Sequence, residues 1–153
     1  MMHLLNGIAY HSISIMNMLA PMYGRRRIAV VSTHELNSLL NNRDQRVVLV
    51  DVRESKEWEV SRIPGAITVE EFRSAPDSHR QSLVIAYCTV GGRSLLFAQS
   101  LARKGYDVRN YQGSMLDWCK NHLPLTAANG DETHRVHTYT RLFHVPDQYE
   151  QTT

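Results

Sequence analysis

The chain has 153 residues, of which 42% are hydrophobic and 21% are charged, and this composition is typical of one folded domain with an ordinary core. A formal charge of +2, from 17 Lys and Arg against 15 Asp and Glu, disfavours nucleic acid or an acidic membrane as the main partner. Two cysteines, Cys88 and Cys119, are too few for a disulfide framework and suit free thiols in a reducing compartment.

Residues 1–27 are predicted to form an N-terminal extension that is helical, with Pro21 marking the end of the helix. Its apolar residues have the spacing of one helix face, and they are Leu4, Leu5, Ile8, Ile15, Met16, Leu19 and Met22. This face is expected either to pack on the chain's own domain or to serve docking or dimerisation. Disorder, or a start of the protein at a later methionine, is the third alternative. A helix on a membrane surface is disfavoured because the polar face lacks Lys and Arg.

The same stretch predicts neither a membrane span nor a signal peptide. Polar residues such as Asn6, His11 and Asn17 interrupt the apolar run, and no Lys or Arg precedes it. We therefore expect a cytoplasmic protein. The run Arg25-Arg26-Arg27 is interpreted as a solvated boundary rather than an anion-binding patch.

From residue 28 onward, apolar strand patterns alternate with helical patterns. Strands are predicted over residues 28–31, 47–52, 67–69, 83–88 and 108–111. Ser32 and Glu35 form a capping-box motif that begins one helix, and Ser114 is expected to cap the last. Further helical segments are expected over residues 55–60, 70–73 and 94–104. This alternation predicts an α/β fold with a mostly parallel sheet of about five strands and helices on both faces.

Asp51 lies inside the apolar strand at residues 47–52. A buried carboxylate requires a partner, and Arg53 is the nearest cation in the sequence. We expect Asp51 and Arg53 to have a structural role rather than a catalytic one.

The stretch with the clearest chemistry begins at Cys88, where a strand ends and a glycine-bearing loop opens a helix. Backbone N–H groups of such a loop can converge on the sulfur, and the helix N-terminus adds partial positive charge, so the thiolate is favoured. Arg93 adds a permanent cation at the far end of the loop. The candidate site residues are Cys88, Thr89, Val90, Gly91, Gly92, Arg93 and Ser94.

Residues 126–153 lose the alternation and are predicted to be a C-terminal extension or a partly ordered tail, although the pattern from Val136 to Leu142 also fits an added edge strand. His134 and His137 have a spacing that suits a metal, but no further ligand pattern accompanies them. We predict no metal site and no cofactor.

Three stretches together resemble the rhodanese family of sulfurtransferases. The first is Asp51-Val52-Arg53 with Glu57-Trp58 and the turn Ile63-Pro64-Gly65-Ala66, the second is the loop from Cys88 to Ser94, and the third runs from Gly113 to Pro124. The resemblance covers roughly residues 28–125 and implies a three-layer rhodanese-like domain there. One departure is visible, because the family often has Gly-His where this chain has Ser61-Arg62.

The resemblance implies that the Cys88 thiolate takes sulfur from a donor as a persulfide and passes it to an acceptor such as cyanide or a thiol. The other loop residues would hold the anion and the persulfide, with Asp51 and Arg53 in support. The implied partners are a small sulfur donor and acceptor, with a sulfur-carrier protein as a further option, and no nucleic acid. The oligomeric state is left open.

Two rival functions are weighed against this expectation. Cysteine phosphatases share the fold but have one more residue between cysteine and arginine, and here Arg93 comes five places after Cys88, so phosphatase chemistry is disfavoured. A non-catalytic rhodanese-like binding or regulatory module is the alternative. Cys119 is interpreted as a packed or surface thiol, with a resolving cysteine as the less favoured role.

Overall fold

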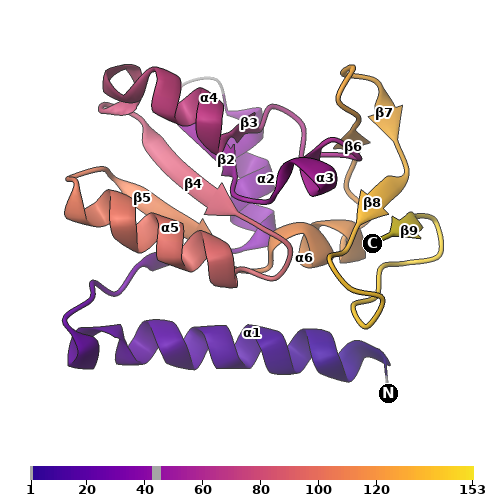
Figure 1. The fold of residues 1–153 in the computed structure, drawn as a ribbon, viewed down its shortest axis with the longest axis horizontal. Helices are drawn as coiled ribbons and strands as arrows, with labels where there is room; N and C mark the ends of the chain where they lie inside the picture. Colours follow the sequence, from indigo (N-terminus) through magenta and orange to yellow (C-terminus); the bar gives the residue numbers. More distant parts are fainter. Residues whose placement is uncertain (1, 43–45) are drawn as a thin grey trace.

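The computed structural model describes residues 2–42 and 46–153. Its centre is a five-stranded sheet in which every pairing is parallel, with the strand order β1-β5-β4-β2-β3 (Figure 1). The strands are β1 (Ala29–Val31), β2 (Val47–Asp51), β3 (Ile67–Thr68), β4 (Leu83–Tyr87) and β5 (Val108–Tyr111). The predicted α/β fold with a parallel sheet of five strands is confirmed.

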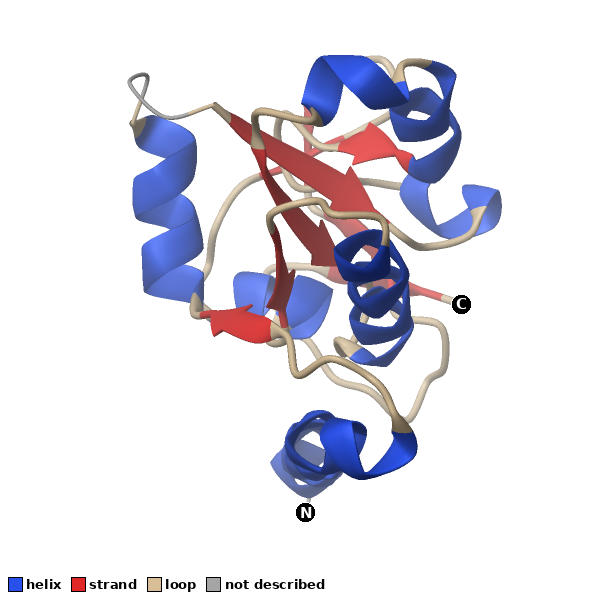
Figure 2. Ribbon diagram, turned by 90° about the vertical axis from the view of Figure 1, so that its left-hand side faces the viewer, coloured by secondary structure: helices blue, strands red, loops and turns tan. Residues whose placement is uncertain are grey.

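Helices cover both faces of this sheet (Figure 2). Side chains alternate along each strand, so neighbouring residues enter opposite cores: Leu49 and Ile85 pack in the cluster that contains Trp118, whereas Val50 and Val84 pack in the cluster that contains Leu95. The helices are α2 (Thr33–Asn41), α3 (Ser55–Trp58), α4 (Val69–Ser74), α5 (Gly92–Arg103) and α6 (Ser114–Lys120), and 3-10 turns cover Ala20–Tyr23 and Pro76–His79.

The local start signals in the sequence behave as expected at α2. The Ser32 hydroxyl accepts a hydrogen bond from the Glu35 N–H at 3.2 Å, and the Glu35 carboxylate accepts one from the Ser32 N–H at 2.9 Å. At α6 the prediction is wrong: Gly113 is the capping residue, and Ser114 is the first helical residue, with φ 53°. Its hydroxyl is engaged elsewhere, as described below.

Helix α1 (Met2–Leu19) forms as predicted, but it packs through a different face. Ile13, Asn17 and Ala20 are buried, whereas Leu4, Ile8 and most of the other apolar residues of the expected face are exposed. Two hydrogen bonds of a buried polar side chain explain this orientation of the helix. The Asn17 side chain donates to the Ile28 carbonyl at 2.8 Å and accepts from the Ile28 N–H at 2.9 Å, so this face of the helix is held against the domain.

The residues after 124 are more regular than the predicted tail. They form strands β6 (Leu125–Thr126), β7 (Glu132–Thr133), β8 (Arg135–His137) and β9 (Glu150–Thr152), where β6 pairs antiparallel with β7 and β8 pairs parallel with β9. Val136 and Tyr149 join the core cluster of the domain, which supplies the burial that a tail would lack. Among the described residues, no helix has the length and apolar character needed to cross a bilayer.

Candidate active site

Cys88 directly follows β4, a central strand with neighbours on both sides, and only 1% of the residue is exposed. Helix α6 holds the start of the cysteine loop in place. The N–H groups of Met115 and Leu116 donate hydrogen bonds to the carbonyls of Cys88 and Thr89 at 3.1 and 3.2 Å. The Ser114 hydroxyl accepts the Cys88 N–H at 3.1 Å. The sulfur is therefore carried on a backbone that two elements, β4 and α6, hold in position.

The main donor to the sulfur is the backbone of Gly91, whose N–H donates to Cys88 Sγ at 3.1 Å. The Ser94 hydroxyl lies 3.6 Å from the same sulfur, but it also donates to Asn110 Oδ1 at 2.7 Å, and it has a single proton to give. The Asn110 amide in turn donates to the Gly91 carbonyl at 3.1 Å. Asn110 thus connects both groups that face the sulfur.

Gly91 is the loop glycine that the geometry requires. Its φ is +92°, and a Cβ there would lie 2.4 Å from the Gln112 carbonyl oxygen. Gly92 is the first residue of α5, and a Cβ on it would lie 3.7 Å from Ile13, an ordinary contact. The sequence pattern does not distinguish Gly91 from Gly92. Only the backbone conformation shows that the first position requires glycine and the second does not.

Arg93 is held by a carboxylate that sequence reasoning did not assign to the site. Its guanidinium donates to both Glu57 oxygens, at 2.6 and 2.8 Å, and the Thr89 hydroxyl donates to Glu57 at 3.0 Å. Burial alone would raise the pKa of Glu57, but the hydrogen bonds from Arg93, from the backbone of the Glu54 cap and from Thr89 lower it to about 2. Nothing in the sequence marked Glu57 as buried, because it is polar and lies in a short, mostly polar helix.

The C-terminal segment also reaches the site. The guanidinium of Arg93 lies over the Tyr139 ring, 5.1 Å from its centroid, and Tyr139 is itself 55% exposed. The Tyr139 N–H donates to His137 Nδ1 at 3.1 Å, and burial lowers the pKa of His137, so the neutral ring is favoured near neutral pH. Residues after 126 therefore form part of the rim around the cysteine loop.

Asp51 and Arg53 form the buried ion pair that the sequence suggested. The Arg53 guanidinium donates to Asp51 at 2.9 and 2.7 Å and to the Ser61 carbonyl at 2.6 Å. The Tyr87 hydroxyl donates to Asp51 at 2.6 Å and accepts from the Ile63 N–H at 3.1 Å. The pair thus fixes the turn that follows Ser61 against β2 and β4, and no hydrogen bond in the described structure joins it to Cys88.

Cys119 lies in the core on the α6 side of the sheet, fully buried, and burial raises its pKa to about 12. This position agrees with the interpretation of Cys119 as a packed thiol. No group of three or more His, Cys, Asp or Glu side chains within residues 2–42 and 46–153 is arranged to hold a metal.

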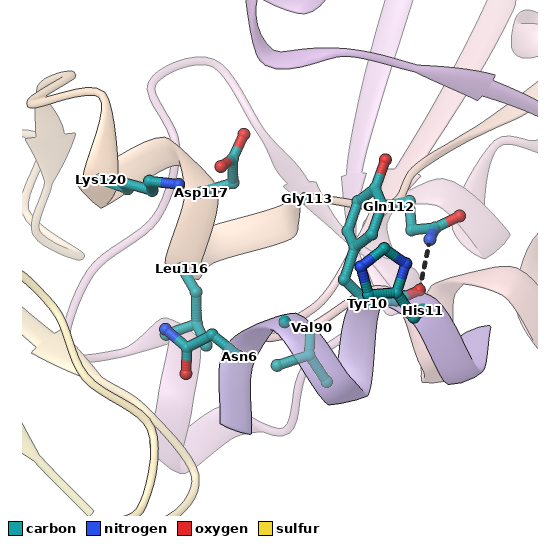
Figure 3. Close-up of a pocket in the computed structure, with 10 residues that line it drawn as sticks. Asn6, Tyr10, His11, Val90, Gln112, Gly113, Leu116, Asp117 and Lys120 are labelled. Carbon is teal, nitrogen blue, oxygen red and sulfur yellow. Dashed lines mark hydrogen bonds between the residues drawn. The ribbon is translucent and has the colours of Figure 1, made fainter. Parts of the chain in front are cut away.

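Val90 is the loop residue that faces the N-terminal helix. Its side chain lines a cavity of about 370 Å³ between α1 and α6, shown in Figure 3, together with Tyr10, His11 and Leu116. The Gln112 amide donates to the Tyr10 carbonyl at 2.8 Å along this cavity. Helix α1 is thus in contact with the back of the cysteine loop.

The comparisons with known proteins agree with this architecture. The family model described as Rhodanese-like domain matches residues 32–121. The chain is 36% identical over 70 residues to a tRNA sulfurtransferase of Desulfurococcus amylolyticus, which covers 44% of this chain but only 14% of that protein. It is 30% identical over 105 residues to a thiosulfate:glutathione sulfurtransferase of Saccharomyces cerevisiae, covering 57% of this chain and 75% of that protein.

A solved structure shows the same likeness in three dimensions. The crystal structure of a rhodanese-like domain protein from Staphylococcus aureus superposes with a TM-score of 0.52 at 26% identity, covering 60% of this chain and 91% of that one. The match of the family model over more than half of the sequence, together with this fold, leads to one conclusion: the chain belongs to the rhodanese-like domain family.

Proposed function

We propose that the protein is a sulfurtransferase that carries sulfane sulfur as a persulfide on Cys88. The observation that supports this most directly is the donor from Gly91 to Cys88 Sγ at 3.1 Å, at the carboxyl end of a central parallel strand. A backbone N–H directed at the sulfur can donate a hydrogen bond to the negative charge that the sulfur carries as a nucleophile or as a persulfide. The same donor would serve the thiolate before transfer and the persulfide after it.

The reaction has two half-steps that balance without a cofactor. With thiosulfate as donor, the Cys88 thiolate attacks the outer sulfur, the S–S bond of thiosulfate breaks, and sulfite leaves with the electron pair. The acceptor, cyanide or a thiolate, then attacks the outer sulfur of the persulfide and the Cys88 thiolate leaves, so thiocyanate or a new persulfide is released.

The residues around Arg93 assist by position. Glu57 accepts two hydrogen bonds from the Arg93 guanidinium. Arg93 therefore acts mainly by orienting the loop and by adding one positive charge near an anionic sulfur donor. Asp51 and Arg53 act further back, by holding the turn after Ser61. The two free cysteines support the expected cytoplasmic location, where thiols remain reduced.

The relatives support the class of reaction. One is named a tRNA sulfurtransferase and another a thiosulfate:glutathione sulfurtransferase, so sulfur transfer is the activity that these two names share. For this chain we take thiosulfate as the first donor to test, and cyanide and glutathione as the first acceptors.

The deciding experiment measures the mass of the intact protein after incubation with thiosulfate and no acceptor. We expect one added sulfur atom, located at Cys88 by peptide mapping and removed by cyanide with release of thiocyanate. Cys88→Ser should show neither the added mass nor transfer. Cys119→Ser is the matched control, since it removes the other cysteine, and it should keep both.

One observation favours the alternative, a binding or regulatory module: Cys88 is only 1% exposed, so a donor must displace part of its cover. If Cys88 acquires no sulfur from thiosulfate or from a low-molecular-weight persulfide while the protein is folded, the proposal of catalysis is wrong and the binding module is the better description.

A further inference from the structure

Helix α1 forms the outermost layer of the molecule in both ribbon views (Figures 1 and 2). It packs inward through Ile13, Asn17 and Ala20 and leaves an apolar face outside. Of the thirteen large hydrophobic residues that are exposed among those described, nine belong to α1 and the turn after it: Leu4, Leu5, Ile8, Tyr10, Ile15, Met16, Met18, Met22 and Tyr23. We call Leu4, Ile8, Ile15 and Met18, together with Met22 in the 3-10 turn that follows, the outward face of α1.

The apolar residues of the outward face lie along one side of α1 and of the turn after it, at intervals of three, four or seven positions, and the exposed His11 lies on the same side between Ile8 and Ile15. Each of the five apolar residues is at least half exposed, from 52% for Ile8 to 77% for Met22. An exposed apolar area of this extent marks an interaction surface.

The charged side chains that follow this face in the sequence are positive. The sequence has no Asp or Glu before Glu35, and Arg25, Arg26 and Arg27 follow the 3-10 turn Ala20–Tyr23 and Gly24. All three arginines are exposed, and none forms an ion pair with any residue that the structure describes. Arg25 and Arg26 line a shallow cavity with Arg103 of α5, so a fourth cation lies beside them.

We propose that the outward face of α1 and Arg25–Arg27 bind the surface of a membrane rich in anionic lipid, with the helix lying in the plane of the headgroups. Apolar side chains would enter the boundary of the acyl chains while the arginines contact lipid phosphates. This inference is independent of the chemistry at Cys88. It concerns where the domain is held rather than which reaction it performs.

The charges favour a bilayer over a second copy of the chain. Two α1 helices facing each other, in either direction, would bring no acidic residue to the arginines, because residues Met2 to Leu19 include no Asp or Glu. An anionic bilayer supplies the missing counter-charge. The absence of Lys and Arg from the polar face, which disfavoured a membrane helix in the sequence, carries less weight because that face packs on the domain through Asn17.

The test is flotation of the full chain with vesicles of phosphatidylcholine and phosphatidylglycerol at about 3:1, compared with vesicles of phosphatidylcholine alone. We expect binding to the anionic vesicles, weak binding to the neutral ones, and release by about 1 M salt. Replacing Arg25, Arg26 and Arg27 by Gln should weaken partitioning about 100-fold, at about fivefold per charge. Ile15→Glu should weaken it about tenfold or more.

Ser74→Glu is the matched control, because it adds the same negative charge at an exposed position of α4, on the opposite side of the molecule from α1 in Figure 1; this variant should bind like the wild type. Circular dichroism confirms that each variant is folded. Absence of binding to anionic vesicles, or equal binding to neutral ones, would overturn the proposal. So would a dimer in solution that Ile15→Glu dissociates without any vesicle binding, since it would assign the face to a second copy.

Discussion

The Glu57 carboxylate accepts hydrogen bonds from both terminal nitrogens of the Arg93 guanidinium, at 2.6 and 2.8 Å, although the two residues are 36 positions apart in the sequence. Arg93 is the one Lys or Arg between Cys88 and Ser94, and Glu57, which binds it, is fully buried. The orientation of the loop around Cys88 therefore depends on a residue of α3, which lies well before the loop in the sequence.

Removing the charge of Glu57 should weaken both the fold and sulfur transfer. We expect Glu57→Gln to lower the free energy of unfolding by about 2 kcal/mol, less than for a fully buried pair because Arg93 is about one-third exposed. Sulfur transfer should fall about tenfold as the loop loses its orientation. Glu59→Gln is the matched control, one exposed carboxylate near the end of the same helix, and it should change neither quantity; equal effects of the two variants would contradict the argument.

Glu57 should also make stability sensitive to acid. Its pKa of about 2 lies below the ordinary value of 4.5, so the folded state binds fewer protons than the unfolded state. The stabilisation is complete above about pH 4.5 and is lost as the pH falls toward 2, about 2 kcal/mol of it between neutral pH and pH 3. Urea unfolding at several pH values should show the gap between wild type and Glu57→Gln closing over this range. A gap that stays constant would mean that Glu57 titrates normally.

The two loop glycines should respond in opposite ways to alanine. Gly91→Ala places a Cβ 2.4 Å from the Gln112 carbonyl oxygen at a φ of +92°, so we expect a loss of about 3 kcal/mol or more and a displaced N–H at the sulfur. Gly92→Ala meets only an ordinary contact with Ile13 at the start of α5 and should be neutral or stabilising by up to about 1 kcal/mol. Thermal unfolding and the persulfide mass assay measure the two effects separately.

Tyr139 should limit access to Cys88. Its ring packs on the Arg93 guanidinium, a contact worth about 0.5–1 kcal/mol at an exposed site. We expect Tyr139→Ala to raise the rate at which iodoacetamide alkylates Cys88 about two- to fivefold, as the rim loosens. Leu142→Ala changes another exposed residue of the same segment and should leave the alkylation rate unaltered. If Tyr139→Ala leaves the rate of Cys88 alkylation unchanged, another group limits access to the cysteine.

Several features were predictable because the forces that produce them act between neighbours in the sequence. Continuous apolar runs mark β2 and β4, and the hydrogen bonds exchanged by Ser32 and Glu35 start α2. Asp51 and Arg53 are two residues apart, so their pairing was also within reach of the sequence. The family resemblance rests on such local stretches, and for this reason it is visible in the sequence alone.

The sequence by itself determined the parallel α/β fold and the position of Cys88 at the end of a strand, because periodicity and loop residues are local properties. Only the tertiary structure decided that Glu57 holds Arg93, that Asn110 and Ser114 support the loop, and that Tyr139 reaches its rim. It also turned the apolar stripe of α1 outward, because two hydrogen bonds from one buried asparagine fix the opposite face on the domain. These outcomes depend on distances between residues far apart in the chain, which no local pattern encodes.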